Sequence, residues 1–321
     1  MTAQHTRAPT AAGVAAARAK IGAILPPTPL LPLEIAGQTL WCKAECLQPI
    51  GAFKIRGAWH RLSDLNAAER ARGVVGVSSG NHAQGVAWAA RRLGIAATIV
   101  MPADAPRVKL EATRALGAVI VLYDRPGGED RDAVAERLCM ERGATLVHAF
   151  ADPWVIEGQG TVGLEVTEQL GAEPDRLVTP CGGGGLAAGL ALACSSAEIV
   201  PVEPEGWDDV ARSLKAGRIL SVGKDAPPTA CDALQTPATR PINFAVLQQR
   251  CKIGLSVTPA QLRAAQRLAF SQLRLVLEPG GAAGLAAVLA GKVAVGARTV
   301  VVLSGGNTDA ADFARVLASN D

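Results

Sequence analysis

Short apolar runs alternate with helix-like stretches from about residue 74 onward, and this alternation constrains the fold more than any other feature. The strand-like runs lie at 74–78, 97–101, 118–123, 144–150, 176–180, 198–204 and 298–307. The apolar runs of the first four are short and continuous, which suits a strand buried on both faces of a sheet. Strands that alternate with helices are typical of parallel, doubly wound sheets. The pattern therefore predicts an α/β chain with two sheet-forming blocks, one on each side of a chain reversal near Ala151.

The composition excludes several classes of protein. The chain has 321 residues, enough for about two domains, and its 49% hydrophobic and 19% charged residues exclude a disordered chain. A net charge of only +3 (32 basic minus 29 acidic residues) and 3% aromatic residues argue against nucleic acid as a partner. No apolar run reaches the roughly 20 residues of a membrane-spanning helix. Seven irregularly spaced cysteines favour a reducing compartment, so we expect a cytoplasmic protein.

Three turns rich in glycine, serine or asparagine directly follow strand-like runs. They are SSGN (78–81), CGGGG (181–185) and SGGN (304–307). In parallel α/β sheets ligands lie at the carboxyl ends of the strands, and binding residues are often on loops of this kind. We therefore expect the three turns to surround a single ligand site.

The four consecutive glycines, Gly182–Gly185, indicate what that ligand carries. Without Cβ atoms they can direct several backbone N–H groups at one phosphate, and the helix N-terminus that follows adds positive potential. Gly182, Gly184 and Ala187 also fit a dinucleotide-binding fingerprint, with Glu203 21 residues after the first glycine. An NAD-dependent oxidoreductase is therefore the alternative from a different class. Against it, the fingerprint normally occupies the first strand–helix turn of its domain, and here it comes late.

Lys54 stands between apolar neighbours in the segment GAFKIRGA. Desolvation lowers the pKa of a lysine and frees its amine to attack a carbonyl, although most lysines beside apolar residues lie at the surface. A reactive lysine next to a phosphate cradle is what pyridoxal phosphate requires. Asn81 could then bond the ring hydroxyl of the cofactor, and Ser304 could serve as a neutral partner for its ring nitrogen.

Several ordered motifs extend over almost the whole chain. They are PTPLLPL (27–33), KAECLQPIGAFKIRGA (43–58), SSGNHAQG (78–85), MPADAPRVK (101–109), GQGT (158–161), CGGGGLAAG (181–189), VEPEG (202–206), EPGGAAGLAA (278–287) and LSGGN (303–307). In this order they resemble the threonine/serine dehydratase and serine racemase family of fold-type-II pyridoxal phosphate enzymes. The resemblance implies an α/β fold of the tryptophan synthase β type, two doubly wound open-sheet domains with the cofactor in the cleft between them, and a homodimer. Residues 71–149 would form a small mobile domain, and residues 1–70 and 150–321 the large cofactor-binding domain.

The resemblance also implies roles for individual residues. Lys54 would hold pyridoxal 5'-phosphate as a Schiff base and then remove the α-proton of the substrate. The substrate carboxylate would lie against Ser78, Asn81 and His82. The other implied cofactor contacts are Phe53, Asn81, Gly182, Gly183, Gly184, Gly185, Leu186 and Ser304.

The implied activity is dehydration of a small amino acid that carries a β-hydroxyl group, which yields a 2-oxo acid and ammonia. We expect L-threonine or L-serine first. Phenylserine and 3-hydroxyaspartate stay open because Ala52 replaces the usual serine and CDAL (231–234) departs from the family near the substrate. Ser79 occupies the place of the acid/base of the racemase branch, so serine racemisation is a sibling alternative, although its hydroxyl could equally bond its own loop.

A divalent cation is a further implication of the resemblance. Glu203, the carbonyl of Trp207 and Asp209 stand at the spacing of the family's cation site, and oxygen ligands of this kind suit Mg²⁺ or Ca²⁺. The two carboxylates could equally be ordinary solvated groups.

Overall fold

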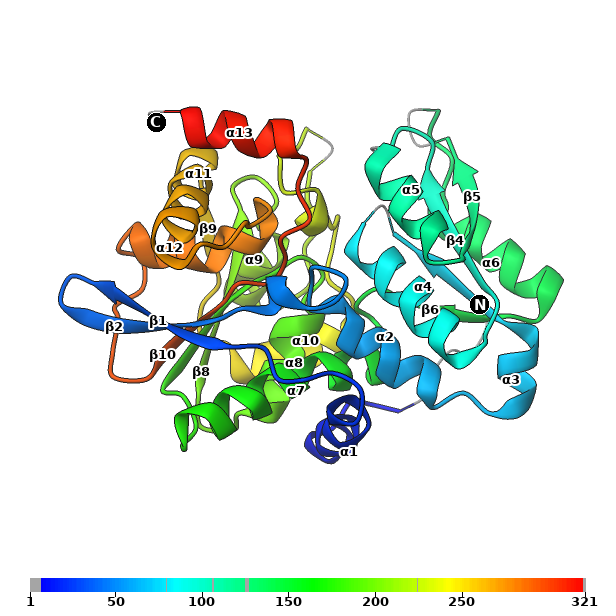
Figure 1. The fold of residues 1–321 in the computed structure, drawn as a ribbon, viewed down its shortest axis with the longest axis horizontal. Helices are drawn as coiled ribbons and strands as arrows, with labels where there is room; N and C mark the ends of the chain where they lie inside the picture. The colour runs from blue at the N-terminus through cyan, green and yellow to red at the C-terminus, as the bar shows by residue number, and fades with distance from the viewer. Residues whose placement is uncertain (1–6, 79, 106, 125–126, 224, 320–321) are drawn as a thin grey trace.

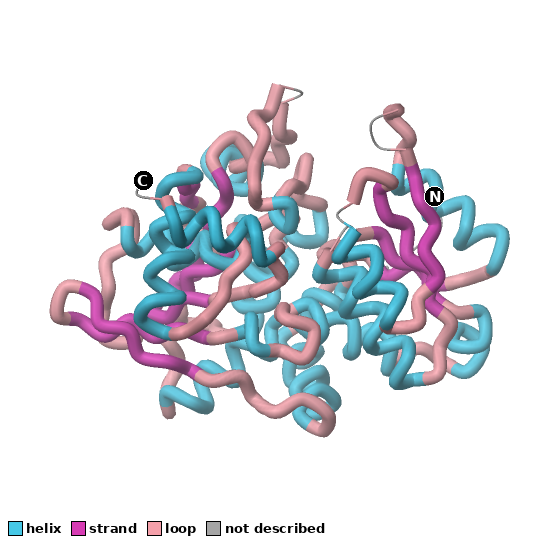
Figure 2. Tube along the Cα trace, turned by 45° about the horizontal axis from the view of Figure 1, so that its top comes forward, coloured by secondary structure: helices cyan, strands magenta, loops and turns pink. Residues whose placement is uncertain are grey.

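The computed structural model describes residues 7–78, 80–105, 107–124, 127–223 and 225–319. Its strands form two separate sheets, one in each lobe of the molecule, and helices surround both (Figure 1). Coloured by secondary structure, the strands gather in two groups with helices and loops between them (Figure 2). The predicted α/β fold with two open, parallel-rich sheets is confirmed.

The larger sheet has the strand order β1-β2-β10-β7-β8-β9. Its strands are β1 (Leu30–Ile35), β2 (Gln38–Lys43), β7 (Arg176–Pro180), β8 (Glu198–Pro204), β9 (Leu255–Val257) and β10 (Thr299–Val302). All neighbours in it are parallel except β1 and β2, which form an antiparallel hairpin. Its helices are α1 (Ala11–Gly22), α2 (Lys54–Ser63), α7 (Pro153–Leu170), α8 (Gly185–Ala193), α9 (Asp209–Ala216), α10 (Pro241–Arg250), α11 (Pro259–Leu268), α12 (Ala283–Leu289) and α13 (Ala310–Ala318). Short turns of helix complete it: η1 (Glu45–Leu47), η2 (Asp232–Leu234), the π-helical η3 (Ala269–Leu273) and η4 (Gly280–Ala282).

The smaller sheet has the order β5-β4-β3-β6 and is parallel throughout. Its strands are β3 (Val74–Val77), β4 (Ala97–Pro102), β5 (Val119–Tyr123) and β6 (Thr145–Val147). Its helices are α3 (Ala67–Arg72), α4 (Asn81–Leu93), α5 (Arg107–Ala115) and α6 (Arg131–Arg142). All six residues of β4 are buried, which explains its continuous apolar sequence. None of the helices in the described ranges is long and apolar enough to cross a bilayer.

Some elements were not predicted from the sequence. The hairpin β1–β2 and the short strand β9 were not predicted because each lies at or near an edge of the sheet and lacks a continuous apolar run. In β1 only Leu33 is buried, while Pro32 and Glu34 interrupt the apolar pattern. The run at 144–150 is shorter as a strand than expected, since β6 ends at Val147. The stretch 221–245 contains η2 and the start of α10 at Pro241.

Close packing of α7 against α8 positions the tetraglycine turn. A Cβ atom added at Gly189 on α8 would lie 2.4 Å from the carbonyl oxygen of Ile156 on α7, and one added at Gly160 would lie 2.6 Å from the carbonyl oxygen of Gly189. Only glycine permits this approach of the two backbones. Because α8 begins at Gly185, directly after the turn, this contact fixes the turn relative to the sheet.

Candidate active site

A cavity of about 430 Å³ lies between the two lobes and is lined by residues of both. Three helices begin at its wall, because Lys54, Asn81 and Gly185 are the first residues of α2, α4 and α8. Their N-termini direct positive backbone potential into the cavity. The structure brings together here most of the residues predicted from the sequence: Phe53, Lys54, Ser78, Asn81, His82, Gly182, Gly183, Gly184, Gly185, Leu186 and Ser304. Ser79 lies outside the described residues.

The amine of Lys54 reaches the interior of this cavity. Its Nζ donates a hydrogen bond to the carbonyl oxygen of Ala149 (2.7 Å) and lies 5.1 Å from the centre of the Phe53 ring. Desolvation lowers the pKa of Lys54 to about 8. About a tenth of the amine is therefore neutral at pH 7, far more than for an ordinary lysine, and the neutral amine is the nucleophile. The Phe53 backbone N–H also donates to the carbonyl oxygen of Ser304 (3.1 Å), which links the lysine segment to the turn after β10.

The tetraglycine turn has no room for side chains. A Cβ atom added at Gly183 would lie 2.3 Å from the ring of Phe150, and one at Gly182 would lie 3.1 Å from the hydroxyl of Thr236. Gly184 has φ +88°, a conformation that strains other residues. The hydroxyl of Thr239 donates to the carbonyl oxygen of Gly183 (3.1 Å), which helps to hold the turn. The turn is thus a cradle without side chains, and backbone N–H groups of such a turn suit a phosphate.

Asn81 is held by two residues of the larger lobe. Its Nδ2 donates to Oε1 of Glu278 (2.6 Å), and its Oδ1 accepts from Nδ2 of Asn307 (2.8 Å). Burial, and after it the charge of Asp232, raises the pKa of Glu278 to about 7, while the hydrogen bond from Asn81 opposes the shift. Glu278 and Asn307 were not predicted as site residues, although both stand in glycine-rich motifs and Asn307 lies three residues after Ser304.

The expected substrate side of the cavity contains Ser78 and His82. The hydroxyl of Ser78 accepts a hydrogen bond from the backbone N–H of Gly80 (3.1 Å). His82 is buried, and its Nε2 lies 2.8 Å from the carbonyl oxygen of Val147, so Nε2 carries the proton and Nδ1 can only accept. Burial lowers the pKa of His82 to about 3, which keeps the ring neutral. A carboxylate here would therefore meet backbone N–H groups at the start of α4 rather than this imidazole.

Charged side chains line the same cavity from both lobes. Lys109 on α5 forms an ion pair with Asp232 on η2, and Arg240 next to α10 lies 3.3 Å from Asp132 on α6. Arg131 is the second guanidinium near Asp132, at 3.6 Å. Two arginines therefore share one carboxylate. The sequence did not predict the pairs Lys109–Asp232 and Arg240–Asp132, because their members are 123 and 108 residues apart.

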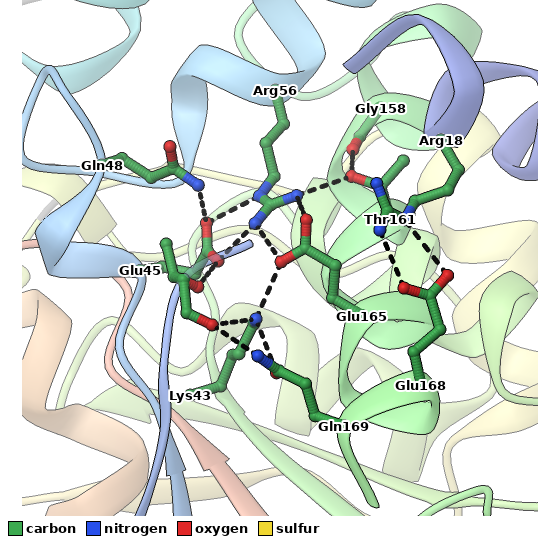
Figure 3. A network of polar contacts seen from close by, with 11 residues as sticks. Arg18, Lys43, Glu45, Gln48, Arg56, Gly158, Thr161, Glu165, Glu168 and Gln169 are labelled. Carbon is green, nitrogen blue, oxygen red and sulfur yellow. Dashed lines mark hydrogen bonds and ion pairs between the residues drawn. The ribbon is translucent and has the colours of Figure 1, made fainter. Parts of the chain in front are cut away.

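The helix that carries Lys54 is anchored by a buried charge network (Figure 3). Arg56 donates to both oxygens of Glu45 (2.7 Å each) and to both oxygens of Glu165 (2.8 and 2.7 Å). Lys43 donates to Glu165 (2.8 Å). All four side chains are inaccessible to solvent. Since residues two apart on a helix point about 200° apart, Arg56 fixes α2 from the side opposite the cavity.

The predicted cation residues do not line the cavity: Glu203 lies near the end of β8, and Asp209 is the first residue of α9. Both oxygens of Glu203 accept from backbone N–H groups at the start of α9, those of Val210 (3.0 Å) and Ala211 (2.8 Å). Asp209 accepts from the N–H of Thr239 (2.8 Å) through Oδ2, and its Oδ1 is buried without a hydrogen bond. Burial raises the pKa of Asp209 to about 6 and raises that of Glu203 as well. Because Glu203 lies outside the cavity, it is not placed to bind a ribose there, which the dinucleotide-binding alternative would require.

A desolvated lysine and a glycine cradle that line one cavity of an α/β fold are the features of a pyridoxal-phosphate-binding class of enzyme. The chain belongs to the family described as Pyridoxal-phosphate dependent enzyme, which residues 22–305 match. It is 40% identical over 286 residues to the L-threo-3-hydroxyaspartate ammonia-lyase of a Pseudomonas species, with 88% of each chain covered. It is 38% identical to the L-threonine ammonia-lyase of Thermotoga maritima, with 88% of this chain and 71% of that protein covered. The structure of maize serine racemase is similar, with a TM-score of 0.90, 34% identity, and 97% and 98% of the two chains covered.

These comparisons confirm the predicted family, fold type and cofactor, and they set the NAD-dependent alternative aside. The residues present also fit pyridoxal phosphate on structural grounds. Lys54 supplies a desolvated amine for its aldehyde, and the turn at Gly182–Gly185 supplies a cradle that side chains would fill. The cavity joins the two.

Proposed function

We propose that this enzyme is an ammonia-lyase for amino acids with a β-hydroxyl group, and that L-threonine or L-serine is its substrate. One observation carries this proposal: the desolvated amine of Lys54 shares a cavity with the tetraglycine cradle and with the N-terminus of α4. The three features together provide a base, a cofactor site and a place for a small carboxylate. The relatives that are ammonia-lyases support the same reaction.

In this proposal each residue has one task. Lys54 Nζ holds the cofactor in the resting enzyme and takes the α-proton of the substrate during turnover. Gly182–Gly185 and Leu186 bind the phosphate, Phe53 packs beside the cofactor, and Ser304 faces its ring nitrogen. Bound pyridoxal phosphate supplies the electron sink that makes the α-proton acidic. A neutral partner such as Ser304 keeps that sink weak, which suits elimination of the β-hydroxyl group.

A specific observation favours 3-hydroxyaspartate as a second candidate substrate. Arg131 and Arg240 line the cavity, and both guanidinium groups lie near the carboxylate of Asp132 (3.6 and 3.3 Å), so they are available to bind a further carboxylate. A second carboxylate on the substrate would complete the pairing. The hydroxyaspartate ammonia-lyase of Pseudomonas is consistent with this candidate.

Serine racemisation and phenylserine dehydration stay as alternatives. Racemisation needs an acid/base on the face opposite Lys54, and Ser79 is the residue proposed for it. The similarity to maize serine racemase supports keeping this alternative. A divalent cation, Mg²⁺ or Ca²⁺, bound by Glu203, Asp209 and the Trp207 carbonyl is proposed as well, and the buried Oδ1 of Asp209 without a hydrogen bond supports it. We also propose a cytoplasmic homodimer with a mobile domain at 71–149.

The experiment that tests the function is product analysis with the cofactor-loaded enzyme. It is incubated with L-threonine, L-serine, phenylserine and L-threo-3-hydroxyaspartate, and 2-oxo acid, ammonia and the D-amino acid are measured. We expect 2-oxo acid and ammonia in equal amounts from L-threonine or L-serine, and neither from Lys54→Ala. A preference for 3-hydroxyaspartate that Arg131→Gln abolishes would establish the second candidate. D-Serine that accumulates faster than 2-oxo acid, and is lost in Ser79→Ala, would contradict the lyase.

A further inference from the structure

The side chain of Asn81 has only one favourable orientation in this structure. Asn307 uses its Nδ2 group for two acceptors, Oδ1 of Asn81 and the carbonyl oxygen of Ile50 (both 2.8 Å). On the other side Glu278 presents a carboxyl oxygen to Nδ2 of Asn81 (2.6 Å). A flipped amide would set oxygen against oxygen at Glu278 and N–H against N–H at Asn307. Both contacts would lose their hydrogen bonds, and buried groups without partners are costly.

This orientation decides what Asn81 offers to the cavity. An amide nitrogen carries two N–H groups, and Glu278 accepts one of them. Asn81 lines the cavity, so the second N–H is left for a ligand atom. A ligand atom at this point must accept a hydrogen bond, and an ionised ring hydroxyl accepts better than a neutral one.

We propose that Glu278 is a positioning residue that fixes Asn81 as a hydrogen-bond donor and thereby stabilises the ionised ring hydroxyl of the bound cofactor. This inference rests on the proposed contact between Asn81 and that hydroxyl. Glu278 acts only through Asn81 and is not assigned a contact with the cofactor.

Gly305 makes this contact possible. A Cβ atom added there would lie 2.1 Å from Oε1 of Glu278 and 3.2 Å from Nδ2 of Asn81. The backbone N–H of Glu278 donates to the carbonyl oxygen of Gly305 (3.1 Å), which holds the two residues together. Gly305 is therefore the point at which the hydrogen bond can be disturbed without altering Glu278 or Asn81. Among the charged groups in the described chain, Asp232 raises the pKa of Glu278 and Lys109 lowers it.

The test compares variants that keep the acceptor with variants that remove it. Glu278→Met removes the acceptor at similar length, Gly305→Ala displaces it, and Glu278→Gln keeps an amide oxygen for Asn81. The readouts are the ratio of the long- to short-wavelength absorption bands of the bound cofactor, which reports ionisation of the ring hydroxyl, and cofactor dissociation. We expect Glu278→Met and Gly305→Ala to lose the long-wavelength band and to bind the cofactor about tenfold more weakly or worse, as for a lost hydrogen bond to a charged group. Glu278→Gln should restore the wild-type ratio.

A double-mutant cycle separates positioning from a general structural effect. In an Asn81→Ala background, Glu278→Met should change the band ratio no further. An equal change with and without Asn81 would overturn the proposal, and so would wild-type spectra in both Glu278→Met and Gly305→Ala. Because Gly305→Ala tests the same hydrogen bond, failure of Glu278→Met to fold does not prevent the test. If Asn81→Ala leaves the spectrum unchanged, Asn81 does not contact the ring hydroxyl, and this inference fails together with that proposed contact. If Asn81→Ala changes the spectrum but the Glu278 and Gly305 variants do not, only the role of Glu278 is refuted.

Discussion

Replacing Arg56 by methionine should strongly lower the free energy of unfolding of this enzyme, although Arg56 lies on the side of α2 opposite the cavity. The guanidinium donates hydrogen bonds to Glu45, Glu165 and the hydroxyl of Thr161, and none of the three charged groups is accessible to solvent. Methionine fills a similar volume but leaves two carboxylates in the interior. Glu45 would keep only the uncharged donors Thr28 and Gln48.

The magnitude follows from the cost of an unpaired buried charge. Removing one partner of a buried ion pair typically costs about 3–5 kcal/mol, because the remaining charge has lost both its water and its counter-ion. Arg56 serves two carboxylates, and Lys43 still contacts only one of them, Glu165. We therefore expect the free energy of unfolding to fall by at least about 3 kcal/mol at neutral pH.

The loss should depend on pH. Burial alone would raise the pKa of Glu165, but the hydrogen bond and charge of Arg56, together with Lys43, lower it below 4.5. A carboxyl group with a lowered folded-state pKa contributes stability above its unfolded-state pKa, and this contribution disappears as the pH falls through the folded-state value. The difference between wild type and Arg56→Met should therefore be largest at neutral pH. It should shrink as the pH falls, first because the buried carboxyl groups left without Arg56 take up protons at a raised pKa, and further below about pH 4.5 as Glu165 of the wild type is protonated.

Urea unfolding of the apoprotein, followed by circular dichroism and by tryptophan fluorescence, measures this difference. Coincident curves from the two probes justify a two-state treatment. Arg107→Met is the matched control, since the Arg107 side chain is 89% exposed and its ion pair within the described residues is with Glu111 one turn away. The urea midpoint of this variant should not move. A free energy of unfolding for Arg56→Met within about 1 kcal/mol of wild type would refute the argument.

Three further predictions concern the cofactor and the cation. Because desolvation lowers the pKa of Lys54 to about 8, the rate at which apoprotein regains cofactor should rise with pH and level off above about 8, and a rise that continues to pH 10 would contradict it. Gly183→Ala should weaken cofactor binding strongly in an equilibrium titration, since its Cβ atom would lie 2.3 Å from the ring of Phe150. The control Gly223→Ala, whose Cβ atom would have none of the described atoms within 4 Å, should bind the cofactor as the wild type does. Treatment with EDTA should lower the melting temperature if a cation binds after β8, whereas an unchanged melting temperature and no metal by elemental analysis would reject that site.

Prediction from the sequence succeeded where the signal is local. The strands at 74–77, 176–180 and 198–204 are continuous apolar runs, and each was predicted within a residue or two. The hairpin β1–β2 was missed because an edge strand needs only one apolar face. The tetraglycine turn and Lys54 were found because their chemistry requires unusual residues in consecutive positions.

By itself, the sequence determined the α/β class, the three ligand-binding turns and the residues expected to hold the cofactor, since each depends on neighbours in the chain. Only the tertiary structure decided which groups surround those residues. Glu278 lies 197 positions from Asn81, and Arg56 meets Glu165 across 109 positions. Contacts of this kind arise when helices from different parts of the chain pack together, and they leave no periodic pattern in a single sequence. The orientation of Asn81 and the burial of the Arg56 network are therefore properties of the fold.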